Sequence, residues 1–298
     1  MTSLKANGVE IAYDSFGDDT AETILLISGL GAQRIRWAVP FCGMLVAHGY
    51  HVVRFDNRDA GGSTHLHQHA PPDFGVLAAE LGAGRRPDVP YTLGDMAKDA
   101  IGLLDGLGID RAHVVGRSMG GMIAQIMASE HRERVLSLTS IMSSSGNPAL
   151  PPPAPDAMAM MVGPAPDPVA DEAGFLARGL TFARRIAGSG YPFDEAAHRD
   201  LLLEEARRAY DPAGAARQIA AMAVTGDRRQ RLATIAAPTL VIHGAEDPLF
   251  LPACGRDTAA SIPNAEFMLI DGMGHDLPPQ LYGTIAGSIV RTATTKSG

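Results

Sequence analysis

A Gly-x-Ser-x-Gly pentapeptide lies between two apolar stretches, and this arrangement restricts the fold more than any other feature of the chain. The pentapeptide spans residues 116–120 with Ser118 at its centre, and the apolar run before it begins at Ala112. A strand, a sharp turn and a helix in this order form a nucleophile elbow, which raises a serine hydroxyl above the edge of a sheet. The alternative is a glycine-rich turn whose serine only caps the next helix, because short motifs also match by chance.

Glycine suits positions 116 and 120 for a steric reason. A serine on so sharp a turn has a strained backbone, and a Cβ two positions away on either side would meet the neighbouring strand or helix. The same turn places the backbone N–H of Met119 beside any oxyanion that forms at the serine. The motif therefore predicts Ser118 as a nucleophile and Met119 as an oxyanion donor.

Short runs typical of buried strands recur along the chain, with helix-compatible stretches between them. Residues 23–27 and 51–55 form two such runs, and a helix-like stretch containing Trp37 separates them. Short connections of this kind imply right-handed parallel crossovers and an α/β fold. Further strands are expected at residues 9–16, 112–115, 135–142, 238–244 and 265–270, and helices at residues 93–107 and 280–292.

Asp247 and His275 each follow one of these strands directly, so both are expected at the sheet edge where Ser118 is raised. The order Ser…Asp…His is the one that elbow-type hydrolases use. An imidazole can take the serine proton and pass it to the leaving group, and a carboxylate holds the required tautomer. Glu246 is a rival carboxylate, but Asp247 comes one residue later, where the loop has cleared the strand. His243 is still within its strand, where packing or support of the site is expected.

The loop at residues 28–31, Ser-Gly-Leu-Gly, directly follows the strand at 23–27. The second oxyanion donor of an elbow-type site comes from a loop after an early strand. The backbone N–H of Leu30 is therefore expected to act together with that of Met119.

A polar, glycine-rich loop at residues 56–63 follows the strand at 51–55. We expect Asp56 and Arg58 to pair and to brace loops near the site. The alternative is that Arg58 recognises substrate, since functional residues often lie on such loops.

His65, His67 and His69 alternate in the next loop, and this spacing raises the question of a metal site. No cysteine or carboxylate stands beside them at ligand spacing. We therefore expect a solvated loop and no metal.

The composition changes between residues 147 and 230. Prolines and a methionine cluster at 158–161 come first, and an alanine-rich helical stretch follows from about residue 172. This pattern predicts a helical cap (147–230) inserted into a core made of residues 1–146 and 231–298. The methionines suit a pocket for a bulky apolar substrate, because their side chains adapt in shape, or they are ordinary filler between helices.

The formal net charge of −8 argues against a nucleic-acid groove, which needs clustered Lys and Arg. Cys42 and Cys254 show no metal spacing and favour free thiols in a reducing compartment. No apolar run reaches the roughly 18 residues of a membrane span, and the first residues lack a signal core. We expect a cytoplasmic protein without nucleic-acid or membrane partners; its oligomeric state is left open.

Several segments together resemble the α/β-hydrolase superfamily, and within it the aclacinomycin methylesterase type. The segments that bear the resemblance are residues 54–59, 62–64, 110–116, 118–120, 238–242, 247–248 and 272–275. The resemblance implies a mostly parallel eight-stranded sheet flanked by helices, an inserted helical cap and no cofactor. It also implies Ser118, Asp247 and His275 as the catalytic triad.

The sequence departs from that resemblance at Arg117, where related chains often have a smaller or apolar residue. This charge either orients an acidic group or braces a loop. The main hypothesis is a serine esterase acting on a small-molecule ester, such as a methyl or short-alcohol ester of a bulky acid. The alternatives are a C–C bond hydrolase or perhydrolase on the same fold, and a ligand-binding protein without catalysis.

Overall fold

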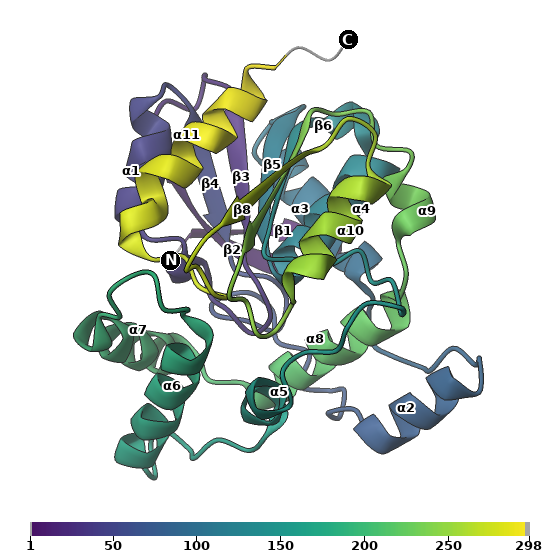
Figure 1. Ribbon diagram of the computed structural model, residues 1–298, viewed down its shortest axis with the longest axis vertical. Coiled ribbons are helices and arrows are strands. Elements are labelled where there is room, and N and C mark those ends of the chain that lie inside the picture. Colours follow the sequence, from purple (N-terminus) through teal and green to yellow (C-terminus); the bar gives the residue numbers. More distant parts are fainter. Residues whose placement is uncertain (1, 296–298) are drawn as a thin grey trace.

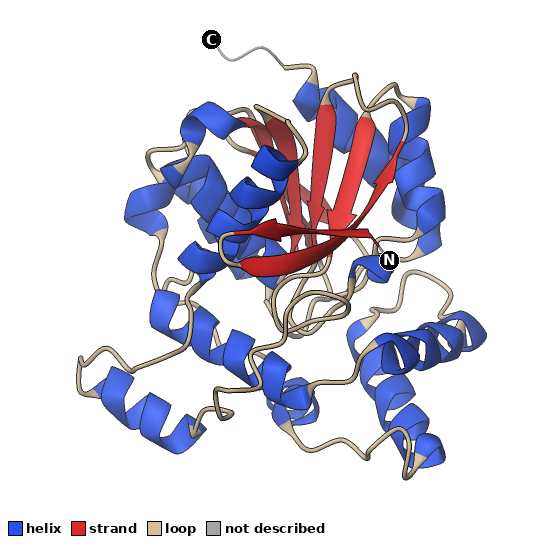
Figure 2. Cartoon of the chain, turned by 180° about the vertical axis from the view of Figure 1, so that it is seen from behind, coloured by secondary structure: helices blue, strands red, loops and turns tan. Residues whose placement is uncertain are grey.

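The apolar runs form the centre of an eight-stranded sheet in the computed structural model, which describes residues 2–295 (Figures 1 and 2). All five residues of β3 are buried, as expected of a strand covered on both faces. The strand order is β1-β2-β4-β3-β5-β6-β7-β8. The pairs β1–β2 and β2–β4 are antiparallel, and every neighbouring pair from β4–β3 to β7–β8 is parallel. The strands are β1 (Thr2–Ala6), β2 (Val9–Phe16), β3 (Thr23–Ile27), β4 (His51–Phe55), β5 (Ala112–Arg117), β6 (Val135–Ile141), β7 (Thr239–Gly244) and β8 (Glu266–Ile270). The expected mostly parallel sheet of eight strands is confirmed.

Strand β1 is the one strand that the apolar pattern did not predict. It is an edge strand that pairs only with β2, and most of its residues are exposed or half-buried. The turn between the two strands is Asn7-Gly8, with φ angles of 46° and 83°. Asn-Gly supplies the two left-handed residues of a tight hairpin turn, so the dipeptide was the available signal for this strand.

Two layers of helices cover the sheet (Figure 1). α1 and α11 pack together on one face, and α3, α4 and α10 lie on the other. The α helices are α1 (Val39–Ala47), α2 (Phe74–Gly82), α3 (Leu93–Gly106), α4 (Met119–Glu130), α5 (Pro155–Val162), α6 (Glu172–Ile186), α7 (Glu195–Arg208), α8 (Pro212–Thr225), α9 (Arg229–Leu232), α10 (Pro252–Ser261) and α11 (Tyr282–Ala293). Short 3₁₀ turns occupy Arg34–Arg36, Arg132–Arg134 and Pro279–Leu281. None of the helices within residues 2–295 is long and apolar enough to cross a membrane.

Helices α5 to α8 lie between β6 and β7 in the chain and beyond one edge of the sheet (Figures 1 and 2). Three of them begin at an aspartate whose side chain accepts a backbone N–H, namely Asp171, Asp194 and Asp211. Helix α9 instead packs against α4 and α10 of the sheet layers. We call residues 147–230 the cap segment below.

The connection from β5 to α4 depends on glycine. Ser118 has φ 55° and ψ −124°, a conformation that non-glycine residues rarely adopt. A Cβ on Gly116 would lie 2.0 Å from the carbonyl oxygen of Gly120, and a Cβ on Gly120 would lie 2.2 Å from that of Ile27. The strand, the helix and the neighbouring β3 can therefore approach this closely only because both residues lack a side chain.

This close approach predicts opposite effects for two glycine-to-alanine changes. Gly116→Ala should lower the free energy of unfolding by about 3 kcal/mol or more, because the new methyl group meets immovable backbone. Gly287→Ala in α11 should raise it by about 0.5–1 kcal/mol, because nothing lies within 4 Å of that Cβ and alanine favours a helix. Urea unfolding of both variants measures the difference, and equal stabilities would contradict the steric explanation.

Candidate active site

The structure brings together the three side chains that the sequence predicts as a proton relay. The His275 Nε2 atom lies 3.0 Å from the Ser118 Oγ atom, and the His275 Nδ1 atom lies 2.7 Å from Asp247 Oδ2. Ser118 comes from the turn between β5 and α4, Asp247 from the loop after β7, and His275 from the loop after β8. The carboxyl ends of parallel strands share one edge, so residues far apart in sequence meet there.

Asp247 is fixed by its own loop. Its side chain is fully buried, and Oδ1 accepts the backbone N–H groups of Leu249 and Phe250 at 2.8 and 2.9 Å. Oδ2 is therefore left for His275. Glu246 points elsewhere, since its carboxylate accepts the backbone N–H and hydroxyl of Ser189 at 2.7 and 2.8 Å. Of the two neighbouring carboxylates, Asp247 is the one in contact with the histidine.

His243 lies behind Asp247 and does not reach Ser118. It is fully buried in β7, and its Nε2 donates to the carbonyl oxygen of Phe250 at 2.6 Å. Burial disfavours the charged imidazole and lowers the pKa of His243. A neutral His243 that holds the Asp247 loop agrees with the supporting position expected from the sequence.

The two expected oxyanion donors are free of other partners. Neither the backbone N–H of Leu30 nor that of Met119 donates to an acceptor within the part of the chain that the structure describes. A Cβ on Gly29 would lie 3.2 Å from the Ser118 Cβ, so the loop after β3 runs directly past the serine. Gln218 of α8 holds this loop by accepting the N–H of Gly31 at 2.8 Å.

A cavity of about 250 Å³ opens at Ser118 and His275. Its walls are mostly apolar and come from both the core and the cap segment. The apolar residues that line it are Leu30, Ala32, Met142, Met161, Phe182, Ala183, Ile186, Leu201, Leu202 and Leu249. A second cavity of about 520 Å³ continues under the cap segment and shares Gly31, Met161, Gly179 and Phe182 with the first. Of the methionine cluster, Met160 and Met161 line a cavity.

Four charged or titratable residues also line the cavity at Ser118. Two of them, Arg36 and Arg117, are cations from the core. Arg36 forms a bidentate ion pair with Glu205 of α7 at 2.7 and 2.6 Å. Burial alone would lower the pKa of Arg36, but the Glu205 charge outweighs it and raises the pKa. Burial and the nearby Arg36 charge lower the pKa of Arg117.

The other two charged or titratable residues of the cavity wall are His198 of α7 and Asp276. The His198 Nε2 atom lies 3.4 Å from Asp276 Oδ2. Burial opposes ionisation of Asp276, but the His198 hydrogen bond and the Arg117 charge bring its pKa down to about 2. The hydrogen bond that His198 donates to Asp276 is also the main cause of the raised pKa of His198. Sequence reasoning missed Glu205 and His198, because nothing in the α7 sequence indicates which of its polar residues face the site.

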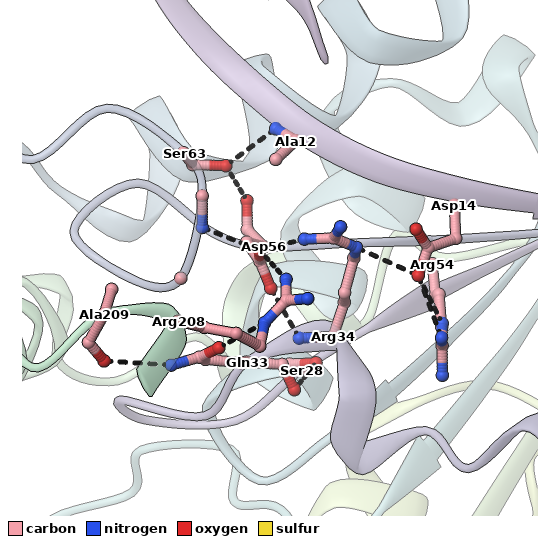
Figure 3. A network of polar contacts seen from close by, with 12 residues as sticks. Ala12, Asp14, Ser28, Gln33, Arg34, Arg54, Asp56, Ser63, Arg208 and Ala209 are labelled. Carbon is pink, nitrogen blue, oxygen red and sulfur yellow. Dashed lines mark hydrogen bonds and ion pairs between the residues drawn. The ribbon is translucent and has the colours of Figure 1, made fainter. Parts of the chain in front are cut away.

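The loop after β4 differs from the expectation, because Asp56 and Arg58 do not pair. Asp56 is fully buried and binds the Arg34 guanidinium, and it accepts the Arg34 backbone N–H at 2.6 Å (Figure 3). Arg208 at the end of α7 adds a third contact at 3.3 Å. Arg58 instead forms a bidentate pair with Asp99 of α3 at 2.6 and 2.5 Å. The two residues lie two positions apart on a short loop, yet each pairs with a residue that is distant in the sequence.

The histidine loop also gains a partner that is distant in sequence. His65 Nδ1 lies 2.8 Å and His67 Nδ1 lies 3.7 Å from Oδ2 of Asp211, the residue that caps α8. The three ligand-type atoms lie within 4.8 Å of one another. The same Oδ2 lies 3.1 Å from the guanidinium of Arg217, so this carboxylate already faces a cation. These contacts join the loop after β4 to the cap segment.

Comparison with known proteins agrees with the fold and with the hydrolase pattern. Residues 22–279 match the α/β hydrolase fold family. The chain is 31% identical to the rhodomycin D methylesterase DnrP of Streptomyces peucetius, over 94% of each chain. It is 30% identical to a 2-hydroxy-6-oxononadienedioate/2-hydroxy-6-oxononatrienedioate hydrolase of Cupriavidus pinatubonensis, over 86% of this chain and 81% of the relative.

A solved structure with the same fold is the enol-lactonase from Burkholderia xenovorans LB400. Its TM-score to this chain is 0.73 and its sequence identity is 23%, over 99% of this chain and 100% of the enol-lactonase. At this identity the likeness concerns the fold. The family match and the methylesterase identity extend over most of the sequence, and the chain therefore belongs to the α/β hydrolase fold family.

Proposed function

We propose that the protein is a serine hydrolase that cleaves a carboxylic ester through an acyl-enzyme. The observation that supports this most directly is the hydrogen-bonded series Ser118–His275–Asp247 at the mouth of a cavity. In the proposed cycle His275 Nε2 takes the Ser118 proton as Oγ bonds to the ester carbonyl carbon. Asp247 holds the imidazole with Nε2 toward the serine and stabilises the imidazolium that forms.

The negative charge that develops on the carbonyl oxygen needs donors that are already in place. The N–H groups of Leu30 and Met119 are proposed to supply them, each worth about 3–4 kcal/mol by the precedent of similar donors. When the tetrahedral intermediate collapses, the ester C–O bond breaks and His275 returns the proton to the leaving alcohol. Water then attacks the acyl-enzyme, gives its proton to His275, and releases the acid and the Ser118 hydroxyl.

The size of the site favours a bulky substrate, and a relative suggests that the bulk lies in the acid part. The cavity at Ser118 continues into a larger one under the cap segment, and the walls of the first are mostly apolar. A relative that is 31% identical is a methylesterase, which supports a methyl or other short-alcohol ester as substrate. We further propose that residues 147–230 act as the cap that selects this acid.

Ser118→Ala should abolish ester turnover without changing stability. Loss of the nucleophile should lower kcat/KM on p-nitrophenyl esters by about 10⁴-fold or more, while the urea unfolding midpoint stays the same. A fluorophosphonate probe should label the wild-type protein at Ser118 and should not label the variant. Full activity of the variant would overturn the assignment. Absence of both turnover and labelling in the wild type would favour a ligand-binding protein without catalysis.

Asp247→Asn should lower kcat by about 10⁴-fold, because the amide favours the wrong imidazole tautomer. Glu246→Gln is the matched control, since it makes the same chemical change at the neighbouring residue that contacts Ser189. The control should keep its rate within about twofold. If Glu246→Gln were the damaging change, Glu246 would be the carboxylate of the relay.

A C–C bond hydrolase is the second candidate, because a relative that is 30% identical carries the name of a dioate hydrolase. Such a reaction would use the same serine and histidine on a carbon–carbon bond next to a ketone. Wild-type kcat/KM on methyl esters of bulky acids, compared with vinylogous keto acids, separates the two. An ester preference supports the first proposal, and a keto-acid preference supports the second.

A further inference from the structure

Arg117 stands directly before Ser118 and lines the same cavity. Its guanidinium lies over the Trp37 ring at 5.6 Å from the ring centre. Trp37 is fully buried and does not line the cavity, so the ring covers one side of the guanidinium. The Arg117 side chain is held in place from behind and is half-buried rather than free in solvent.

The Arg117 charge has no carboxylate partner in the part of the chain that the structure describes. No Asp or Glu oxygen in residues 2–295 lies within 4.0 Å of it. Of the five N–H groups of a guanidinium, a single one reaches an acceptor, the carbonyl oxygen of Arg36, at a long 3.4 Å. None of the Arg117 nitrogens is among the fully buried side-chain atoms that lack a partner. Its other donors are therefore open to the cavity.

The neighbouring charges are matched among themselves. Arg36 is paired with Glu205 through two short hydrogen bonds. Asp276 is bound to His198 at 3.4 Å. Glu205 and Asp276 lie near enough to act on the Arg117 charge, but their short contacts go to Arg36 and His198, so Arg117 is left without a direct ion pair. A half-buried cation without a direct ion pair leaves hydrogen-bond donors unused, whereas an anion bound there would form charge-assisted and bidentate hydrogen bonds.

We propose that Arg117 binds a carboxylate of the substrate, so that the preferred substrate is an ester that carries a second, anionic group. This inference rests on the proposed ester hydrolysis at Ser118. A methyl or other short alcohol is too small to carry the charge, so the carboxylate belongs to the acid part. The substrate class is then a half-ester of a dicarboxylic or larger polycarboxylic acid. Arg117 is a specificity residue, and the bond cleaved is still the one attacked by Ser118.

The test compares esters that differ only in charge. The substrates are monomethyl esters of succinic, glutaric and adipic acid, each beside the neutral methyl ester in which the free carboxylate is a primary amide. For at least one chain length, wild-type kcat/KM should be about tenfold or more higher for the anion, mainly through a lower KM. Arg117→Met should bring this ratio to about one, and Arg117→Lys should keep part of it.

Arg231→Met is the matched control, because it removes the same formal charge from an exposed arginine that pairs with Glu130. It should keep the wild-type ratio. Binding of the glutarate half-ester to Ser118→Ala, measured by calorimetry, gives a readout that needs no turnover, and it should weaken about tenfold when Arg117→Met is added. If kcat/KM for the neutral esters is as high as for every anionic half-ester, the Arg117 proposal is overturned and the esterase proposal stands. Binding that depends on Arg117 without any turnover would overturn the esterase proposal alone.

Discussion

The site depends first on how closely a strand and a helix can approach at the turn that holds Ser118. A Cβ atom on residue 116 would collide with the backbone of Gly120. A Cβ atom on residue 120 would collide with the backbone of Ile27. This contact gives the serine its left-handed conformation and leaves the N–H of Met119 without a helical partner. The proposed nucleophile and one proposed oxyanion donor are thus positioned by main-chain sterics, which a single methyl group would disturb.

A second constraint joins the cap segment to the core. Helix α7 contacts the loop after β3 through Glu205 with Arg36. Arg208 of the same helix contacts Gln33 in that loop and Asp56 in the loop after β4 (Figure 3). Buried ion pairs add little net stability, because desolvation offsets their attraction, but a wrongly placed partner would leave a charge uncompensated. These pairs therefore act mainly on position. They hold α7 over the loop after β3, and residues of both line the cavity.

The parts that could be predicted from the sequence are those with a local cause. Apolar runs predicted seven of the strands, and the glycines around Ser118 predicted the elbow. The positions of Asp247 and His275 at strand ends placed both at one sheet edge. The polar pairs could not be predicted in this way. Asp56 and Arg58 are two residues apart, yet their partners are Arg34 and Asp99, which only the folded chain brings near. Likewise, no pattern in α7 distinguishes Glu205 from its neighbours.

The residues proposed for bond cleavage and the residues that line and charge the cavity are positioned in different ways. The groups proposed for bond cleavage lie on strand ends and loops of the core, and their placement follows from sheet topology. The groups that shape and charge the cavity come largely from contacts between the core and the cap segment, where long-range pairs decide which charges are matched. The Arg117 backbone is part of the elbow, whereas the charges around its guanidinium include Glu205 of α7. A change in α7 would therefore alter the charges around the cavity while leaving the elbow intact.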